Sequence, residues 1–125
     1  MEGAEKNILQ VHNLSIGYIS APLFEKINFS VSQNQIAAVI GMNGTGKSTL
    51  LRTLCNLQSP LAGKVFIAGK DIVSFSAQEL ARIISIVLPG RAEAVQVLSV
   101  SEILFFARAP YTGYLHKLQK TDFEI

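Results

Sequence analysis

Loose alternation of apolar and polar positions marks two strands near the start of the chain. Residues 8–16 predict a half-buried strand that ends near Gly17, and residues 24–31 predict a second strand. The connection between them is short and contains Pro22. Two strands joined this closely predict an antiparallel hairpin that lies beside a parallel core, as in a mixed sheet.

The next segment, Ile36–Ile40, is apolar at every position and follows a polar turn at residues 32–35. Such a run is typical of a strand that is buried on both faces of a parallel sheet. Residues 48–57 then place leucine and cysteine side chains at helical spacing, which predicts a helix with one apolar face. A buried strand and a helix are therefore expected on either side of the intervening loop.

Turn residues and capping signals organise the second half of the chain. Ser76 with Glu79, and Ser99 with Glu102, each fit the capping box that begins a helix. The predicted elements are a strand at residues 64–68, a turn at 69–71, a helix at 77–83, a buried strand at 85–88 and a helix from 99 to about 108.

The loop Gly41–Ser48 carries the clearest chemistry, because it fits the phosphate-loop pattern GxxxxGK[ST] at every fixed position. Its glycines let the backbone curl so that successive N–H groups point into one concavity that suits a triphosphate; they are Gly41, Gly44 and Gly46. Lys47 can reach the β and γ phosphates, and the Ser48 hydroxyl can complete the shell of a magnesium ion. The N-terminus of the following helix also favours phosphate. A glycine turn with a purely structural role is the alternative, and the flanking strand and helix disfavour it.

Composition narrows the class of protein. The chain has 125 residues, of which 49% are hydrophobic, which is enough for one domain or part of one. A net charge of +2 from scattered residues does not favour nucleic acid or an anionic membrane as the main partner. The sequence lacks an apolar run long enough to span a membrane and a secretory signal at its start, so a cytosolic protein is expected.

Several residues with chemical potential are expected to have ordinary roles. The single cysteine, Cys55, excludes an intrachain disulfide and is expected to be a small core residue on the loop helix, with a redox role as the alternative. His12 and His116 have no second histidine or carboxylate at metal-ligand spacing, so both are expected at the surface. Arg91 and Arg108 are expected to be solvated, with contact to phosphate or a partner as the alternative.

Three collinear parts of the chain resemble the first half of an ABC transporter ATP-binding subunit; they are residues 14–18, residues 40–52, and residues 63–65 with 69–72. The Asn43-Gly44 pair and the Ser48–Leu50 continuation separate this family from small GTPases and nucleotide kinases. Ser99–Glu102, followed by Ala107–Gly113, resembles the branch that imports iron-siderophore, haem or cobalamin complexes. The resemblance covers most of the chain.

The resemblance implies an α/β fold, in which a P-loop NTPase core carries an antiparallel β subdomain. Residues 1–125 would be a partial nucleotide-binding domain, with the helical subdomain starting at about residue 99. The implied cofactors are ATP and Mg²⁺. The complete subunit would hydrolyse ATP as a homodimer and would lie at the inner face of the cell membrane, bound to permease subunits and not to nucleic acid.

By the same resemblance, the Tyr18 ring stacks on adenine, as a flat ring on a loop can; an aromatic that plugs the sheet edge is the alternative. The implied nucleotide-binding residues are Tyr18, Gly41, Asn43, Gly44, Thr45, Gly46, Lys47, Ser48 and Thr49, with Ser48 as the metal ligand. The family's magnesium-contacting glutamine falls at Pro89, which has no side-chain oxygen. That contact is expected to be lost or replaced by water, with Gln96 as the alternative.

Hydrolysis in this family needs an aspartate–glutamate pair after a strand, a signature segment and a histidine switch. The sequence contains none of these. Asp122 and Glu124 do not form the acidic pair, because their order is wrong and no apolar run precedes them. The chain is therefore expected to be an N-terminal fragment without catalytic residues. The alternatives are a truncated chain that binds nucleotide weakly or serves as an interaction fragment, and a chromosome-maintenance or repair ATPase with the same loop.

Overall fold

The computed structural model describes residues 7–87 and 99–111 of the chain. These residues belong to two compact units, Met1–Phe75 and Ser76–Ile125. The phosphate loop and the strands belong to the first unit, and the two capped helices belong to the second. We describe each unit by itself.

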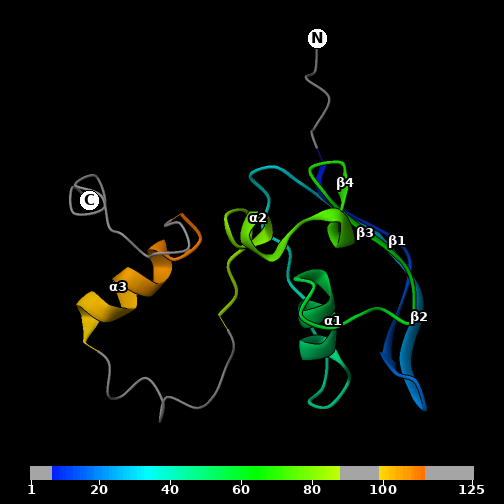
Figure 1. The fold of residues 1–125 in the computed structure, drawn as a ribbon. Helices are drawn as coiled ribbons and strands as arrows, with labels where there is room; N and C mark the ends of the chain where they lie inside the picture. Colours follow the sequence, from blue (N-terminus) through cyan, green and yellow to red (C-terminus); the bar gives the residue numbers. More distant parts are fainter. Residues whose placement is uncertain (1–6, 88–98, 112–125) are drawn as a thin grey trace. The chain divides into compact units, whose positions relative to one another are not determined.

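The first unit is built on a four-stranded sheet with the strand order β2-β1-β3-β4 (Figure 1). Its strands are β1 (Asn7–Tyr18), β2 (Ala21–Ser32), β3 (Ala62–Ile67) and β4 (Lys70–Asp71). Every pair of neighbouring strands is antiparallel. The predicted hairpin and the strand that turns near residue 69 are therefore confirmed, and this sheet is the antiparallel β subdomain. The prediction of a mixed sheet is not met among the described residues, because none of these strand pairs is parallel.

An irregularity in the hairpin explains why the alternation in its sequence is loose. Asn13 and Lys26 have φ angles of 46° and 56°, which L residues rarely adopt. The Asn28 side chain stabilises this region because its Oδ1 accepts a hydrogen bond from the Asn13 N–H at 2.9 Å and its Nδ2 donates to the Lys26 carbonyl at 2.8 Å. The register shifts between Val11 and Leu14, so the buried face of β1 changes phase there.

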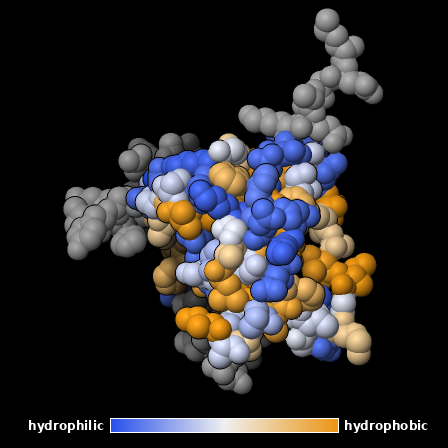
Figure 2. All heavy atoms as spheres, turned by 90° about the vertical axis from the view of Figure 1, so that its right-hand side faces the viewer, coloured by the Kyte–Doolittle hydropathy of each residue, from blue (hydrophilic) through white to orange (hydrophobic). Residues whose placement is uncertain are grey.

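Helix α1 (Lys47–Leu54) contacts β1, and the core of the first unit lies between the helix and the sheet (Figure 1). The buried apolar residues of this unit are Val11, Leu14, Ile16, Leu54, Val65, Ile67 and Ile72. The side of the molecule that carries β1 and β2 shows many hydrophilic side chains over its middle (Figure 2). One face of the sheet therefore packs on α1.

The apolar face predicted for the loop helix is only partly correct. The helix buries Thr49, Thr53 and Leu54, whereas Leu51 is 45% exposed. The Thr53 hydroxyl donates to the Thr49 carbonyl at 2.9 Å, so the buried hydroxyl is satisfied within the helix. Leu57 lies beyond the helix end and is 58% exposed. Two threonines thus take the place that leucines were expected to fill.

The prediction that Ile36–Ile40 forms a buried strand is wrong. The segment has no strand hydrogen bonding, and Ile36 and Ile40 are 100% and 93% exposed. A parallel strand needs neighbouring strands to satisfy its backbone, and none of the four strands of the described sheet pairs with this segment. Residues 85–87 likewise form no strand, contrary to prediction, and Leu88 lies outside the described residues.

The second unit contains α2 (Ala77–Ala81) and α3 (Val100–Arg108), and the first unit ends with a short 3₁₀ helix, η1 (Ile72–Ser74). Both predicted capping boxes are present, at Ser76 and at Ser99. The Gln78 amide and the Arg82 Nε both donate to the Pro110 carbonyl, at 3.0 and 2.8 Å. These bonds join α2 to the turn after α3. Within the described part of the chain, no helix has the length and apolarity needed to cross a membrane.

Candidate functional site

The glycine loop leads into a helix as predicted, but the strand predicted before it, residues 36–40, is not formed. Gly44 and Gly46 have φ angles of 82° and 95°, in the left-handed region that glycine enters without a side-chain clash. Gly46 is the N-cap residue of α1, which begins at Lys47. The order of loop and helix that a phosphate site needs is therefore present.

Lys47 folds back over its own loop. Its Nζ donates hydrogen bonds to the carbonyls of Gly41, at 2.8 Å, and Met42. The Thr45 hydroxyl also donates to the Met42 carbonyl, at 2.8 Å. An ammonium group can donate three hydrogen bonds. Two of those of Lys47 go to backbone carbonyls of the loop, which carry no charge. Phosphate oxygens are stronger, charge-assisted partners for the same group.

The first turn of α1 leaves backbone donors available. The first intrahelical bond runs from the Leu50 N–H to the Gly46 carbonyl at 2.8 Å, so the preceding N–H groups, those of residues 47–49, have no partner within the helix. The first turn contains no acidic residue that would compete for them. The Ser48 side chain is exposed and the Thr49 side chain is buried. Ser48 can therefore offer its hydroxyl to a ligand, and Thr49 only its backbone.

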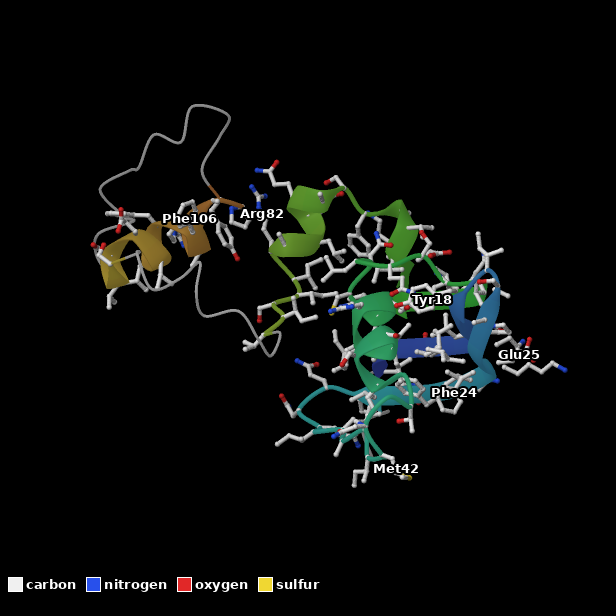
Figure 3. All side chains as sticks on the ribbon, turned by 90° about the horizontal axis from the view of Figure 1, so that it is seen from below. Tyr18, Phe24, Glu25, Met42, Arg82 and Phe106 are labelled. Carbon is white, nitrogen blue, oxygen red and sulfur yellow. The ribbon has the colours of Figure 1, made fainter. Side chains whose placement is uncertain are left out.

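Two apolar residues of β2 contact the loop, and sequence reasoning missed both. A β-carbon built on Gly46 would lie 3.2 Å from Leu23 Cδ1 and 3.5 Å from Phe24 Cε2. Figure 3 shows Phe24 on the side of the hairpin that faces the loop, with Glu25 pointing away. A pocket of about 230 Å³ lies here, with Phe24, Lys47 and Val39 among its lining residues. The alternation of the sequence places Phe24 on the apolar face of a strand, but it does not show what that face contacts.

Tyr18 ends β1 at the turn of the same hairpin, and its side chain is 57% exposed. Gly17 pairs with Pro22, and Ile16 pairs with Phe24. The hairpin that carries Tyr18 therefore also supplies the side chains that contact the phosphate loop. An exposed aromatic ring at this end of the strand can stack on a flat ligand.

The other predicted residues lie apart from this loop or outside the described part of the chain. Burial raises the pKa of the Cys55 thiol, which is half-buried at the C-terminal end of α1. His12 is exposed, and its ring packs edge-on against the Phe66 ring with 5.5 Å between the two ring centroids. The Arg108 guanidinium lies 4.8 Å from the Tyr111 ring centroid. The residues outside the described ranges are Pro89, Arg91, Gln96, His116, Asp122 and Glu124.

Metal ligands do not cluster in the described ranges: residues 7–87 and 99–111 contain no group of three or more histidine, cysteine, aspartate or glutamate residues that could hold a metal ion. Asn43 is exposed in the turn of the glycine loop. The polar groups of the loop include backbone N–H groups, the Lys47 ammonium and the hydroxyls of Thr45 and Ser48. This set of donors suits a phosphate chain with an accompanying cation.

A family model described as "ABC transporter" matches residues 24–121 of the chain. The chain belongs to the ABC transporter family. That match covers the phosphate loop, α1 and both capped helices. It agrees with the loop geometry described above.

Curated relatives within the family include an iron(3+)-hydroxamate import protein and a ferric enterobactin transport protein. The chain is 34% identical over 116 residues to the iron(3+)-hydroxamate import ATP-binding protein FhuC of Bacillus subtilis, covering 93% of this chain and 43% of that protein. It is 33% identical over 116 residues to the ferric enterobactin transport ATP-binding protein FepC of Escherichia coli, covering 93% and 42%. The chain thus spans less than half the length of these relatives. The predicted resemblance to ABC ATP-binding subunits and to their siderophore-importing branch is confirmed.

Among solved structures, an ATP binding subunit of an ABC transporter matches 94% of this chain and 46% of its own length. The two share 26% sequence identity with a TM-score of 0.67. This match confirms the fold class, which is the N-terminal half of an ABC ATPase domain with an antiparallel β subdomain.

Proposed function

We propose that the chain is the nucleotide-binding part of an ABC importer ATPase and binds Mg²⁺-ATP at Gly41–Ser48. The observation that carries this proposal is the loop closed around the Lys47 ammonium at the start of α1. In the bound state the phosphate oxygens replace the Gly41 and Met42 carbonyls as partners of the ammonium. The Lys47 ammonium lies beside the start of α1, where the N–H groups of residues 47–49 have no partner within the helix.

The remaining residues of the loop have distinct roles in this proposal. The Ser48 hydroxyl would be the protein's ligand to Mg²⁺, and the bound ion would offset the negative charge of the phosphates. The backbone N–H groups at the start of α1 receive phosphate oxygens, and the Tyr18 ring stacks on adenine. The proposed nucleotide-binding residues are Tyr18, Gly41, Asn43, Gly44, Thr45, Gly46, Lys47, Ser48 and Thr49.

For the whole protein we propose ATP hydrolysis that drives import of a substrate such as an iron-siderophore complex. The named activities of the relatives FhuC and FepC support this proposal. Residues 1–125 would form part of the nucleotide-binding domain, with the helical subdomain beginning at about residue 99, where α3 lies. The complete subunit would act as a homodimer bound to permease subunits at the inner face of the cell membrane.

We expect the 125-residue chain to bind ATP without turning it over, because its sequence lacks the acidic pair, signature segment and histidine switch. A chain that binds nucleotide weakly, or acts only as an interaction fragment, remains the second candidate. The exposed apolar residues at Ile36–Ile40 favour it. Turnover above background by the purified chain would contradict both candidates, because neither of them hydrolyses ATP.

Calorimetric titration with Mg²⁺-ATP tests the binding proposal. Lys47→Ala removes the ammonium and is expected to abolish measurable binding. Lys64→Ala is the matched control, because Lys64 is an exposed lysine of the same unit that pairs with Asp71 at 3.6 Å. Equal ATP affinity of the wild-type chain and Lys47→Ala would contradict the proposal.

A further inference from the structure

The Gln58 side chain joins the loop after α1 to the end of β1. Its Nε2 donates a hydrogen bond to the Gly17 carbonyl at 3.0 Å, between residues 41 positions apart in the sequence. Gln58 is half-buried, so water competes less for this bond than for one at the surface.

The carbonyl that Gln58 holds belongs to the same peptide unit as the Tyr18 N–H. A peptide unit is planar, so fixing its oxygen fixes the orientation of the whole plane. That plane, together with the φ angle of Tyr18, sets the direction in which Tyr18 projects its side chain. Gln58 therefore acts on the orientation of Tyr18 without touching its ring.

The backbone around Gly17 is irregular and closely enclosed. Gly17 has a φ of 140°, and the register of β1 and β2 shifts between Ile16 and Gly17. A β-carbon on Gly17 would lie 2.6 Å from the Leu23 nitrogen and 2.7 Å from the Ala21 carbonyl oxygen, so no other residue fits. Glycine is also the residue whose backbone is least restricted. The Gln58 bond limits this freedom next to Tyr18.

Gln58 itself is held from both sides. The Leu57 N–H donates to the Arg52 carbonyl of α1 at 2.9 Å, and the Leu61 N–H donates to the Ser15 carbonyl of β1 at 2.8 Å. Helix α1 begins at Lys47, so one continuous segment runs from the phosphate loop to the Gly17 carbonyl. The two ends of the proposed nucleotide site are thereby joined.

We propose that Gln58 is a positioning residue for base recognition, which fixes the Tyr18 ring relative to the phosphate loop. This inference rests on the proposed function, since it needs Tyr18 to stack on the base. Gln58 supplies one neutral hydrogen bond, and the stacked ring supplies the contact with the nucleotide.

Two ligands separate this role from a general effect on folding. ATP carries a base and a triphosphate, whereas inorganic tripolyphosphate carries only the phosphates. Gln58→Ala is expected to weaken ATP binding roughly 3- to 10-fold, the range of one lost hydrogen bond, and to leave tripolyphosphate binding unchanged. Gln58→Glu has nearly the same shape but lacks the donor, so it is expected to weaken ATP binding at least as much. Gln33→Ala, at an exposed glutamine of the same unit, is the control.

A double-mutant cycle with Tyr18→Ala completes the test. Tyr18→Ala alone is expected to weaken ATP binding roughly 5- to 100-fold, as for loss of one base stack. Adding Gln58→Ala to it is expected to cause no further loss, because the ring that Gln58 positions is gone. The thermal midpoint of each variant shows whether it is folded at the temperature of the titration.

The outcomes distinguish this inference from the proposed function. An equal loss for ATP and tripolyphosphate in Gln58→Ala, or multiplicative effects in the cycle, would overturn the role of Gln58 while Lys47-dependent binding stands. Binding of both ligands that does not depend on Lys47 would overturn the proposed function and this inference together.

Discussion

Two apolar segments of this chain, Ile36–Ile40 and α3, behave differently although both are exposed. The first forms no strand, whereas α3 is a helix although the structure buries none of its residues. A helix satisfies its backbone through hydrogen bonds within the segment, and the Ser99 capping box satisfies its start. A strand needs a neighbour. Apolar composition alone therefore predicts neither outcome, and the location of the hydrogen-bond partners decides both.

The largest expected effect tests whether Ile36–Ile40 truly lacks a packing partner. Leu14 has no exposed surface, and Ile40 is 93% exposed. Leu14→Ala is expected to lower the free energy of unfolding by about 2–5 kcal/mol, because it leaves a cavity. Ile40→Ala is expected to change it by less than about 0.5 kcal/mol. Urea unfolding followed by circular dichroism measures both.

A comparable loss in Ile40→Ala and Leu14→Ala would show that the apolar run is packed in solution. In that case hydrogen-bond partners would no longer explain why Ile36–Ile40 and α3 differ. Leu51→Ala provides a reference between the two, because that side chain is 45% exposed on α1. Its expected cost therefore lies between those of the other variants.

A proline in each segment tests the comparison directly. Leu104 lies inside α3, where proline removes a backbone hydrogen bond and clashes with the preceding turn at a cost of about 3 kcal/mol. Leu104→Pro is therefore expected to remove the helical signal of residues 100–108. Ala38→Pro is expected to change little, because Ile36–Ile40 has no ladder to break. Amide chemical shifts of the two segments provide the measurement. The opposite result would be broadened amide signals of residues 36–40 in Ala38→Pro and an unchanged α3 in Leu104→Pro. It would show that hydrogen-bond partners do not explain the difference between the two segments.

Sequence patterns were most reliable where the deciding interactions are local. The hairpin, both capping boxes and the loop that starts α1 depend on neighbouring residues, and all were predicted. The contact of Leu23 and Phe24 with Gly46, and the Gln58 bond to Gly17, join distant positions. Gln58 stands directly before Ser59 and Pro60, and nothing in its neighbouring sequence signals a partner 41 positions away.

Two other features were missed for different physical reasons. Ile36–Ile40 has the composition of a buried strand, but its state depends on partners that its own sequence does not contain. The Thr53 hydroxyl can be buried on α1 because it donates to the Thr49 carbonyl within the helix. A pattern that scores threonine as polar assigns this face to solvent. Hydropathy thus failed where hydrogen bonding compensates for burial.

The smallest expected effect concerns the start of α3 and its dependence on pH. Glu102 Oε2 accepts hydrogen bonds from the Ser99 hydroxyl and the Ser99 N–H, both at 2.7 Å. These bonds lower the pKa of Glu102 below its ordinary value. The ionised carboxylate therefore stabilises the capped helix. This contribution is fully present above the ordinary pKa and is lost as the pH falls through the lowered pKa of the folded state.

Helicity at residues 100–108 is therefore expected to decrease slightly in acid, and the Ser99 and Glu102 amide shifts should move with it. Glu102→Gln keeps an acceptor in the capping box without a titrating group, so its helix signal is expected to stay constant over the same pH range. A parallel acid transition in Glu102→Gln would assign the change to another group. A flat profile in the wild-type chain would instead show that α3 does not depend on its capping box, and the contrast with Ile36–Ile40 would then need a source of helix stability beyond the cap.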